Sequence, residues 1–174
     1  MIKDSGDRKE FDTGAVRGIQ EGKGRMDLVP MDVIGSILHH LNNNYEGFST
    51  EDEVEYLIYE LIELYKREGN LEHLKKSINL FIECNFDNFE EAIFELSKHY
   101  EEGAKKYELR NWEKGIPLSS FIGSASNHFL KHNRGDEDER HDRAFLWNIV
   151  CAIWTHEHKP EMNDLPFGEE KYVE

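Results

Sequence analysis

The sequence predicts an all-α fold of about six helices in a single domain. Apolar residues recur three and four positions apart over several segments, which is the spacing of one helix face. We find no convincing strand pattern in the chain. At 174 residues, the chain is long enough to build one hydrophobic core that folds alone. We therefore expect residues 1–174 to form one helical bundle.

The N-terminal part of the sequence predicts an irregular arm followed by one helix. Residues 1–24 are rich in glycine and mixed in charge, so we expect a flexible arm there. Pro30 stands where a first helical turn begins, and MDVIGSILHHL follows it. Because proline is favoured at the first position of a helix, we expect a helix from about Met31 to Leu41.

Two amphipathic helices are expected next. Thr50 and Glu53 have the spacing of a capping box, which opens the segment EDEVEYLIYELIELYKRE. Gly69 and Asn70 are placed to end this helix. The segment LEHLKKSINLFIEC then repeats the helical spacing of apolar residues, so a further helix is expected there.

Three more helices are expected after the interruption NFDN. The first is FEEAIFELSKHYEEGAKKY, which leads into the polar loop ELRNWEKGIP. The second is LSSFIGSASNHFLKH, and Gly135 is placed to end it. The third runs from about Asp138 to His156. The tail from Pro160 onward is expected to be loosely attached.

Charge and composition limit the expected partners and location. The formal net charge of −15 should repel the phosphate backbones of DNA and RNA, so we expect no nucleic-acid partner. An acidic decoy that mimics DNA is an alternative, but the acids are mixed with 21 lysines and arginines. No apolar run approaches the roughly 20 residues that span a bilayer. The polar start and the two cysteines, which fit reduced core thiols (Cys84 and Cys151), favour a cytoplasmic protein with no membrane partner.

Acidic residues at the start of the last helix suggest a cation site. Glu139 and Asp142 form a Glu-x-x-Asp pair, and carboxylate oxygens at this spacing suit Mg²⁺ or Mn²⁺. Acids at a helix N-terminus also interact favourably with the helix dipole and need no ligand. His141 and Asn148 are seven residues apart and point in nearly the same direction from an ideal helix. A buried Asn148 needs hydrogen-bond partners, from a neighbouring helix or from a ligand.

The stretch from Gly103 to Gly115 is locally basic in a very acidic chain. A nucleotide base can stack on Trp112 while nearby cations meet phosphates. Alternatively, Trp112 anchors the loop and the lysines are solvated. The candidate side chains of this stretch are Lys106, Arg110, Asn111, Trp112 and Lys114.

Two weaker signals accompany this stretch. In GKGR, glycines flank Lys23 and Arg25 follows, and glycine-rich backbone with cations can cradle phosphate. The segment does not match a P-loop, and a flexible arm is the alternative. His128 and His132 are four residues apart, as in a zinc pair, but no third soft ligand has a characteristic spacing. We therefore favour His128 alone, as a donor to phosphate or base.

Four segments in this order resemble one family. They are GKGRMDLVP, EEGAKKYELRNWEKGIPLSSF, a helix with Ser-Ala-x-x-His, and GDEDERHDRAFLWN. Together they resemble the dATP/dGTP diphosphohydrolase domain of bacteriophages and prophages, over Gly14 to Pro30 and Tyr100 to Trp154. Residues from about 45 to 89 resemble the helical insertion of longer members. The family pattern matches Lys23, Arg25, Asp27, Leu28, Gly103, Ala104, Lys106, Tyr107, Asn111, Trp112, Lys114, Ser124, Ala125, His128, His141, Trp147 and Asn148.

The resemblance implies an all-α, MazG-like domain that hydrolyses a deoxypurine triphosphate to monophosphate and pyrophosphate. MazG-like domains hold Mg²⁺ with Glu-x-x-Glu on one helix and Glu-x-x-Asp on another. Glu139 and Asp142 fit the second pair, and Glu95 and Glu102 are our candidates for the first. Because MazG-like sites often form between subunits, the resemblance also allows a homo-oligomer.

The leading hypothesis is an intracellular nucleoside triphosphate pyrophosphohydrolase that depends on Mg²⁺ or Mn²⁺. Phosphates would be bound by Lys106, Arg110 and Lys114, together with Lys23 and Arg25. The base or sugar would contact Asn111, Trp112 and Asn148, and His128 and His141 would hydrogen-bond phosphate or orient a ligand. The metal would be held by Glu95, Glu102, Glu139 and Asp142. The alternative is a phage protein that sequesters a nucleotide or a nucleotide-derived immune signal. It is motivated by the incomplete set of metal-binding acids and by Asn127, where the family has arginine; the chain also has Glu108 where the family has glycine.

Overall fold

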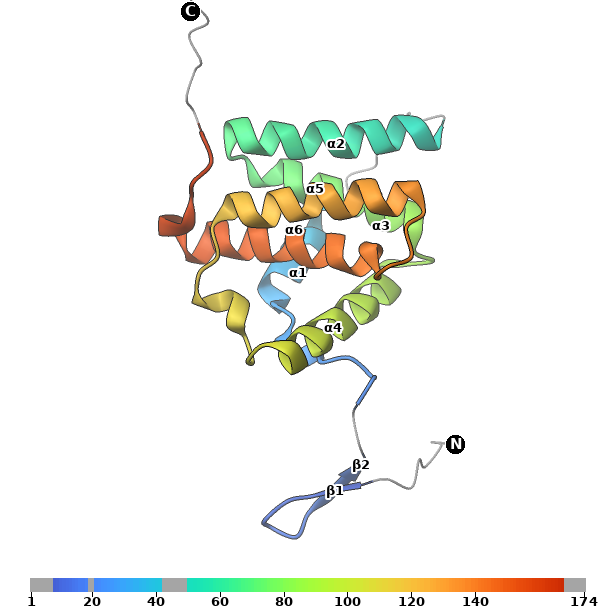
Figure 1. Ribbon diagram of the computed structural model, residues 1–174, viewed down its shortest axis with the longest axis vertical. Helices are drawn as coiled ribbons and strands as arrows, with labels where there is room; N and C mark the ends of the chain where they lie inside the picture. Colours follow the sequence, from blue (N-terminus) through green and yellow to red (C-terminus); the bar gives the residue numbers. More distant parts are fainter. Residues whose placement is uncertain (1–7, 19–20, 42–49, 168–174) are drawn as a thin grey trace, which may run out of the picture.

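A computed structural model describes residues 8–18, 21–41 and 50–167 of the chain. The prediction of an all-α fold is confirmed, because helices make up most of these ranges (Figure 1). The α-helices are α1 (Met31–Leu41), α2 (Glu51–Glu68), α3 (Leu71–Asn85), α4 (Phe89–Lys106), α5 (Leu118–Arg134) and α6 (His141–His158). Three short 3₁₀ turns connect them, namely η1 (Met26–Leu28), η2 (Asn111–Lys114) and η3 (Pro160–Met162).

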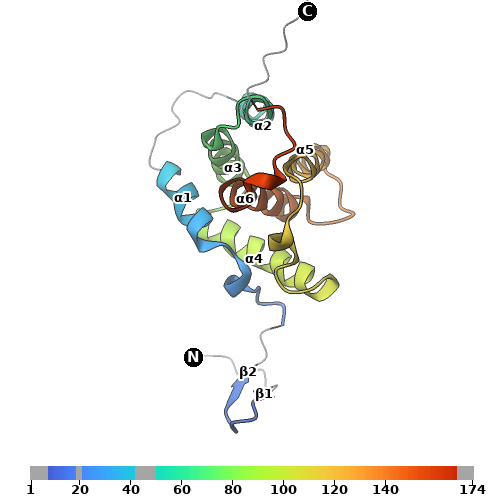
Figure 2. The ribbon, with the colours of Figure 1, turned by 90° about the vertical axis from the view of Figure 1, so that its left-hand side faces the viewer.

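Helix α6 lies at the centre of the bundle. It contacts α1, α3, α4 and α5, and Figure 2 shows these helices around it. Most residues of α6 are buried on every side, as expected of a helix that has no solvent face. Helix α2 completes the bundle by packing on α3 and α5. Where α3, α5 and α6 meet, the rings of Phe81, Phe129 and Phe145 contact one another.

The predicted helix ends are mostly confirmed by their caps. The Thr50 hydroxyl accepts a hydrogen bond from the Glu53 amide at 3.3 Å, as a capping residue does. Gly69 and Gly135 follow α2 and α5 with φ of 67° and 80°, a left-handed conformation that favours glycine. The last helix differs from the prediction, because it begins at His141 and not near Asp138. Arg140 has non-helical backbone angles, so residues 136–140 form a loop that folds back toward α5.

The N-terminal arm contains a strand pair that the sequence analysis did not predict. Strands β1 (Arg8–Glu10) and β2 (Val16–Gly18) pair antiparallel, with Lys9 opposite Arg17. Gly14 has a φ of 80° in the turn that joins them. All residues of both strands are exposed, so no apolar alternation marks them in the sequence. The hairpin hangs away from the helices in Figure 1.

The expectation of a loosely attached tail is wrong as far as residue 167. Asp164 accepts hydrogen bonds from the amide and the hydroxyl of Ser119, in the first turn of α5. The Phe167 ring packs edge-on against Tyr65 of α2, with centroids 5.4 Å apart. The prediction of two core thiols is confirmed for Cys151, which is buried, and is wrong for Cys84, which is exposed.

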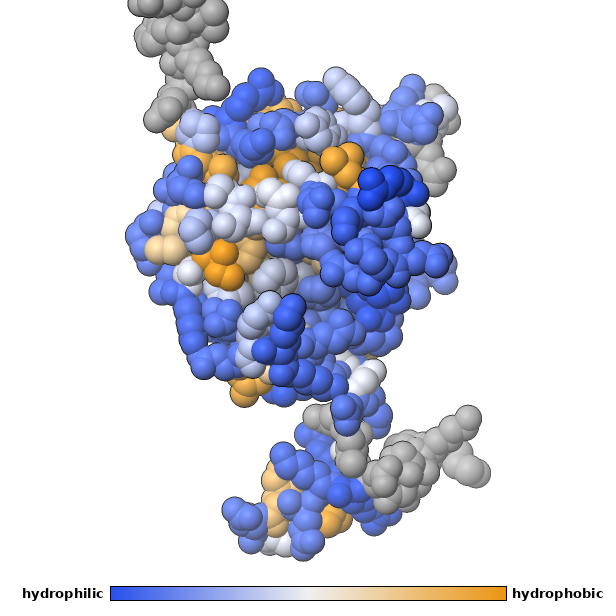
Figure 3. All heavy atoms as spheres, in the orientation of Figure 1, coloured by the Kyte–Doolittle hydropathy of each residue, from blue (hydrophilic) through white to orange (hydrophobic). Residues whose placement is uncertain are grey.

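The face of the molecule seen in Figure 3 is mostly hydrophilic, and its apolar residues form small, separate groups. This distribution agrees with the high content of charged residues, 33% of the chain. Within the described ranges, no helix is both long enough and apolar enough to cross a membrane.

Candidate functional site

A cavity of about 480 Å³ opens between the end of α4, the η2 turn, and the facing sides of α5 and α6. Its volume lies in the range of small-molecule binding sites. Ionisable and aromatic side chains line it together, which is typical of sites that bind a charged ring-bearing ligand. The lining includes His99, Tyr100, Glu102, Lys106, Tyr107, Glu108, Arg110, Asn111, Trp112, Ser124, His128, Glu139, Trp147 and Asn148.

The cavity brings together two regions that the sequence separates. Trp112 comes from the loop after α4, while Glu139 comes from the loop before α6 and Asn148 from α6 itself. His141 is 2% exposed, so it does not point into open solvent. The spatial convergence expected of the tryptophan loop and the head of the last helix is therefore present.

Trp112 is a buried wall of the cavity and not an exposed stacking platform. It is 5% exposed, and its ring makes edge contacts with Tyr100 of α4 and Trp154 of α6. Arg110 precedes it with a φ of 55°, unusual for a residue other than glycine, which turns the chain into η2. The indole therefore anchors the loop to the core, which is the second of the two roles that the sequence suggested for Trp112.

The predicted phosphate-binding cations have different surroundings. Lys106 lines the cavity, and within the described part of the chain its ammonium makes no ion pair. Arg110 also lines the cavity, but its guanidinium donates to the Asp27 carbonyl and pairs with Glu113. Lys114 pairs with Glu108 and is not part of the lining. Lys106 is thus the cation most accessible to a ligand in this cavity.

The glycine-rich segment that holds Lys23 and Arg25 lies beside this cavity and not in its lining. Its backbone amides already have an anionic partner, because Gly22 and Gly24 each donate to the Glu101 carboxylate at 2.8 Å. These hydrogen bonds hold the pKa of Glu101 below its usual value. Lys23 is exposed, and Arg25 pairs with Asp27 at the edge of a second, open hollow.

Arginines pair with three of the four carboxylates that were expected to share Mg²⁺, namely Glu95, Glu102 and Asp142. Arg143 donates to Glu95 at 2.6 Å and reaches Glu102 at 3.4 Å. Arg140 pairs with Asp142 at 2.6 Å and approaches Glu95 at 3.5 Å. Each guanidinium supplies the positive charge that a metal ion would otherwise supply. As arranged here, these carboxylates do not fit a shared Mg²⁺ site.

The pKa values agree with this pairing. Burial alone would raise the pKa of Glu95, but hydrogen bonds from Lys98 and Arg143 outweigh burial and hold it below its usual value. Burial likewise opposes the ionised form of Asp142, and its hydrogen bonds with Arg140 lower the pKa overall. Both carboxylates are therefore ionised at neutral pH, and the arginines balance their negative charge.

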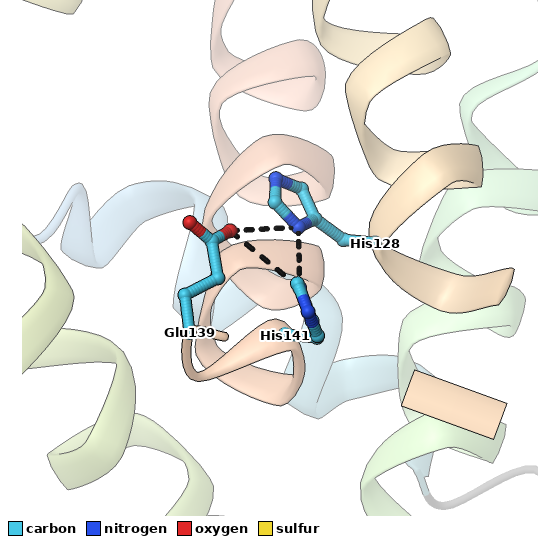
Figure 4. A group of neighbouring side chains, drawn as sticks. All are labelled: His128, Glu139 and His141. Carbon is cyan, nitrogen blue, oxygen red and sulfur yellow. Dashed lines mark hydrogen bonds and ion pairs between the residues drawn. The ribbon is translucent and has the colours of Figure 1, made fainter. Parts of the chain in front are cut away.

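A different group of side chains converges at the edge of the cavity. His128 of α5, Glu139 of the α5–α6 loop and His141 at the start of α6 turn toward one another (Figure 4). The Nδ1 atoms of the two histidines are 3.0 Å apart. The Glu139 Oε1 atom lies 3.0 Å from Nδ1 of His128 and 3.5 Å from Nδ1 of His141. In the described part of the chain, this trio and the group Asp136, Asp138 and His141 are the sets spaced to hold a metal ion.

Neighbouring groups fix the chemistry of the two histidines. Asp138 accepts from His141 Nε2 at 2.7 Å, and hydrogen bonds from Lys131 and His141 lower the pKa of Asp138 to about 2. Because an ionised carboxylate can only accept, His141 carries its proton on Nε2. Burial lowers the pKa of His128, which favours a neutral ring at pH 7.

Asn148 satisfies part of its hydrogen-bonding capacity inside its own helix. Its amide nitrogen donates to the Ala144 carbonyl at 2.8 Å, and the residue is 5% exposed. Within the described ranges, its side-chain oxygen makes no hydrogen bond. An acceptor in the cavity wall suits an amino or imino group on the edge of a base.

The sequence analysis did not assign a role to three residues that shape this site. His99 lines the cavity beside Trp147, and burial lowers its pKa. Its shared helix face with Glu102, three residues on, was the available signal. Arg140 and Arg143 neutralise the acidic cluster, and they stand inside the acid-rich run GDEDERHDR. The run shows that cations are interleaved with its acids, but their partners Glu95 and Glu102 lie on α4, outside the run.

The fold and the site define a class of protein, an all-α domain whose cavity combines aromatic walls, a cation and a histidine–carboxylate cluster. A family model described as dATP/dGTP diphosphohydrolase, N-terminal, matches residues 67–165. Since this range is more than half of the 174-residue chain, the protein belongs to that family. The family name implies diphosphohydrolase activity and a nucleotide ligand. Comparisons with curated proteins and with solved structures gave no match.

The matched range of residues 67–165 covers most of the cavity lining but not the glycine-rich segment. It contains the cavity-forming residues from His99 to Asn148. The segment Gly22 to Leu28 lies outside it. The matched range also includes α3, which packs on α1, α4 and α6 within the bundle.

Proposed function

We propose that the protein hydrolyses a purine deoxynucleoside triphosphate to the monophosphate and pyrophosphate, with a divalent cation such as Mg²⁺ or Mn²⁺. The observation that carries the proposal is the cavity, whose lining brings Lys106 and the acceptor Asn148 together with His128 and Glu139. Family membership supports the same reaction class. If the gene belongs to a phage, the reaction takes place in the host cytoplasm and serves phage nucleotide metabolism.

The residues of the cavity divide the work of binding. Lys106 neutralises phosphate charge, with Arg110 as a second cation once phosphate competes with Glu113. The aromatic walls, including Trp112 and Trp147, contact the faces and edges of the base. The Asn148 oxygen accepts from an amino group of the purine, which a pyrimidine presents at a different distance from the sugar.

The histidine–carboxylate cluster supplies the chemistry. Hydrolysis adds water across the bond between the α- and β-phosphates, so pyrophosphate leaves and one proton is released. A neutral imidazole and a carboxylate assist this step by accepting the proton of the attacking water or by holding a divalent ion that acidifies it. His128 and Glu139 both line the cavity and are within reach of a bound phosphate.

The test is a product analysis with dATP and dGTP in the presence of Mg²⁺ or Mn²⁺. We expect equal amounts of monophosphate and pyrophosphate, and a strong loss of kcat in the His128→Gln variant. Lys106→Gln should raise KM by about tenfold, because one charge-assisted contact is lost. Lys75→Gln, on α3 and outside the cavity lining, is the matched control. If neither these nor other nucleoside triphosphates are cleaved, the enzymatic proposal fails.

Sequestration without cleavage is a second candidate, and a specific observation favours it. The arginine pairs of Glu95 and Asp142 replace the oxygen site that MazG-like hydrolysis would use. A pocket of this kind could hold a nucleotide, or a nucleotide-derived immune signal, without metal. Calorimetry separates the two functions, since tight, metal-independent binding with intact ligand recovered supports sequestration and turnover contradicts it.

Self-association is part of the proposal because related sites often lie between subunits. Sedimentation of the full chain with and without nucleotide tests it. A monomer under both conditions would assign the complete site to one chain.

A further inference from the structure

We infer that His128, Glu139 and His141 form a binding site for one divalent transition metal ion, such as Zn²⁺ or Mn²⁺, in preference to Mg²⁺. The site itself stands on geometry and donor chemistry alone. Its role in phosphate hydrolysis rests on the proposed function.

The spacing of the three donor atoms matches the coordination shell of a single ion. Their separations are 3.0, 3.0 and 3.5 Å. Nitrogen and oxygen ligands about 2.1 Å from one ion lie about 3.0 to 3.4 Å apart at octahedral or tetrahedral angles. A triangle with the observed sides has a circumscribed radius of about 1.9 Å, so an ion about 2.1 Å from each atom lies about 1 Å outside the plane. The three residues therefore leave the opposite face of the ion open to water or phosphate.

Two neutral imidazoles leave one contact of the cluster without a proton. Asp138 fixes the His141 proton on Nε2, so Nδ1 of the neutral ring is a lone pair. One proton on Nδ1 of His128 is then shared between that lone pair and the Glu139 carboxylate. The His141 lone pair and the Glu139 oxygen face each other at 3.5 Å with no proton between them. A metal ion accepts the lone pairs of His141 Nδ1 and Glu139, and that of His128 Nδ1 once the His128 proton has moved to Nε2.

The surrounding residues support a metal centre. The hydrogen bond from His141 Nε2 to Asp138 is the carboxylate–histidine contact that orients metal-ligating imidazoles. His141 is 2% exposed and held by the start of α6, whereas Glu139 and His128 reach the cavity, which provides a path for a phosphate. Arg143 and Arg140 occupy the all-oxygen alternative at Glu95 and Asp142.

The donor set selects the class of metal. Two imidazoles with one carboxylate suit zinc, iron and related ions, while Mg²⁺ prefers oxygen ligands and retains several waters. We therefore expect Zn²⁺ and Co²⁺ to bind far more tightly than Mg²⁺.

The test is metal binding without nucleotide. The full chain, stripped of metal with a chelator, is titrated with Zn²⁺ by calorimetry and with Co²⁺ by visible absorption. We expect one ion per chain, an affinity for Zn²⁺ at least about 100-fold above that for Mg²⁺, and a Co²⁺ spectrum that reports nitrogen ligands. Glu139→Gln and His128→Gln should each weaken Zn²⁺ binding by at least about tenfold, and Asp138→Asn by about 10- to 100-fold.

Matched controls identify adventitious binding, because the chain has nine histidines. The control variants are His132→Gln and Glu137→Gln. His132 lies one turn beyond His128 on α5, and Glu137 lies in the same loop as Glu139. Neither should change Zn²⁺ affinity, and circular dichroism verifies that each variant is folded. Equal Zn²⁺ affinity in the wild type and in both cluster variants would overturn the inference, as would Mg²⁺ affinity equal to that for Zn²⁺. Zn²⁺ binding at this site without cleavage of any nucleotide would refute the proposed function and leave the metal site standing.

Discussion

The Glu101 carboxylate fastens the glycine-rich segment to α4, and its removal should release that segment. Glu101 is 6% exposed and accepts from the amides of Gly22 and Gly24 at 2.8 Å. In Glu101→Gln, one amide keeps an oxygen acceptor and the other meets an NH₂ group. Because a hydrogen bond to a charged group contributes about 1.5 to 3 kcal/mol, we expect the local opening free energy to fall by about 2 kcal/mol.

Amide hydrogen exchange measures this change directly. A loss of about 2 kcal/mol corresponds to a roughly 30-fold loss of protection at the amides of Gly22 and Gly24, since 1.4 kcal/mol is tenfold. Glu90→Gln, an exposed residue in the first turn of α4, is the control and should leave both amides unchanged. Unchanged protection in Glu101→Gln would refute the role of the carboxylate.

The same contact should respond to pH. Because the folded pKa of Glu101 lies below its unfolded value, its contribution is fully present above the unfolded pKa of about 4.3. The contribution is lost as pH falls through the folded pKa. Protection in the wild type, corrected for the intrinsic rate, should therefore fall in acid toward that of Glu101→Gln. Parallel pH profiles of the two proteins would contradict the assignment.

Three further predictions concern the glycine-rich segment and two residues of the cavity lining, Trp112 and Asn148. Gly24→Ala should lower the free energy of unfolding more than Gly22→Ala in chemical denaturation. Both glycines have a positive φ, but only at Gly24 would an added Cβ lie close to another atom, 2.0 Å from Ser97 Oγ. Equal effects of the two substitutions would contradict this. Trp112→Ala should lower the free energy of unfolding by about 3 to 5 kcal/mol in the same assay, as expected for a buried tryptophan, and a loss below about 1 kcal/mol would contradict its burial. Asn148→Leu should raise the Kd for dGTP by about tenfold in calorimetry with little change for triphosphate alone, and an equal loss for both ligands would contradict a contact with the base.

The helical bundle was predictable from the sequence because its signals are local. The Thr50 cap, the glycines at 69 and 135, and the apolar spacing each act within a few residues, so they predict element ends without knowledge of the packing. The exposed hairpin of Arg8–Glu10 and Val16–Gly18 was missed because its pairing leaves no apolar pattern. The docked tail was missed because Asp164 acts on Ser119, a partner 45 residues away.

The site was predictable in its residues more than in its pairing. Trp112, His128 and Asn148 were singled out by their positions in motifs, and the structure places all three around one cavity. A spacing rule assigned Glu139 and Asp142 to one ion on the assumption of a continuous helix. The helix begins at His141, which separates Glu139 from Asp142 and turns Glu139 toward His128. Which carboxylate meets which cation depends on tertiary packing, and a single sequence does not encode it locally.

The most direct measurement is a crystal structure of the protein with a non-hydrolysable dGTP analogue, in which a methylene group bridges the α- and β-phosphates. The account predicts density in the cavity between α4 and α6, with the base near Asn148 and the phosphates between Lys106 and Glu139. Density for the analogue at another surface, or an unchanged cavity at a saturating concentration, would contradict it.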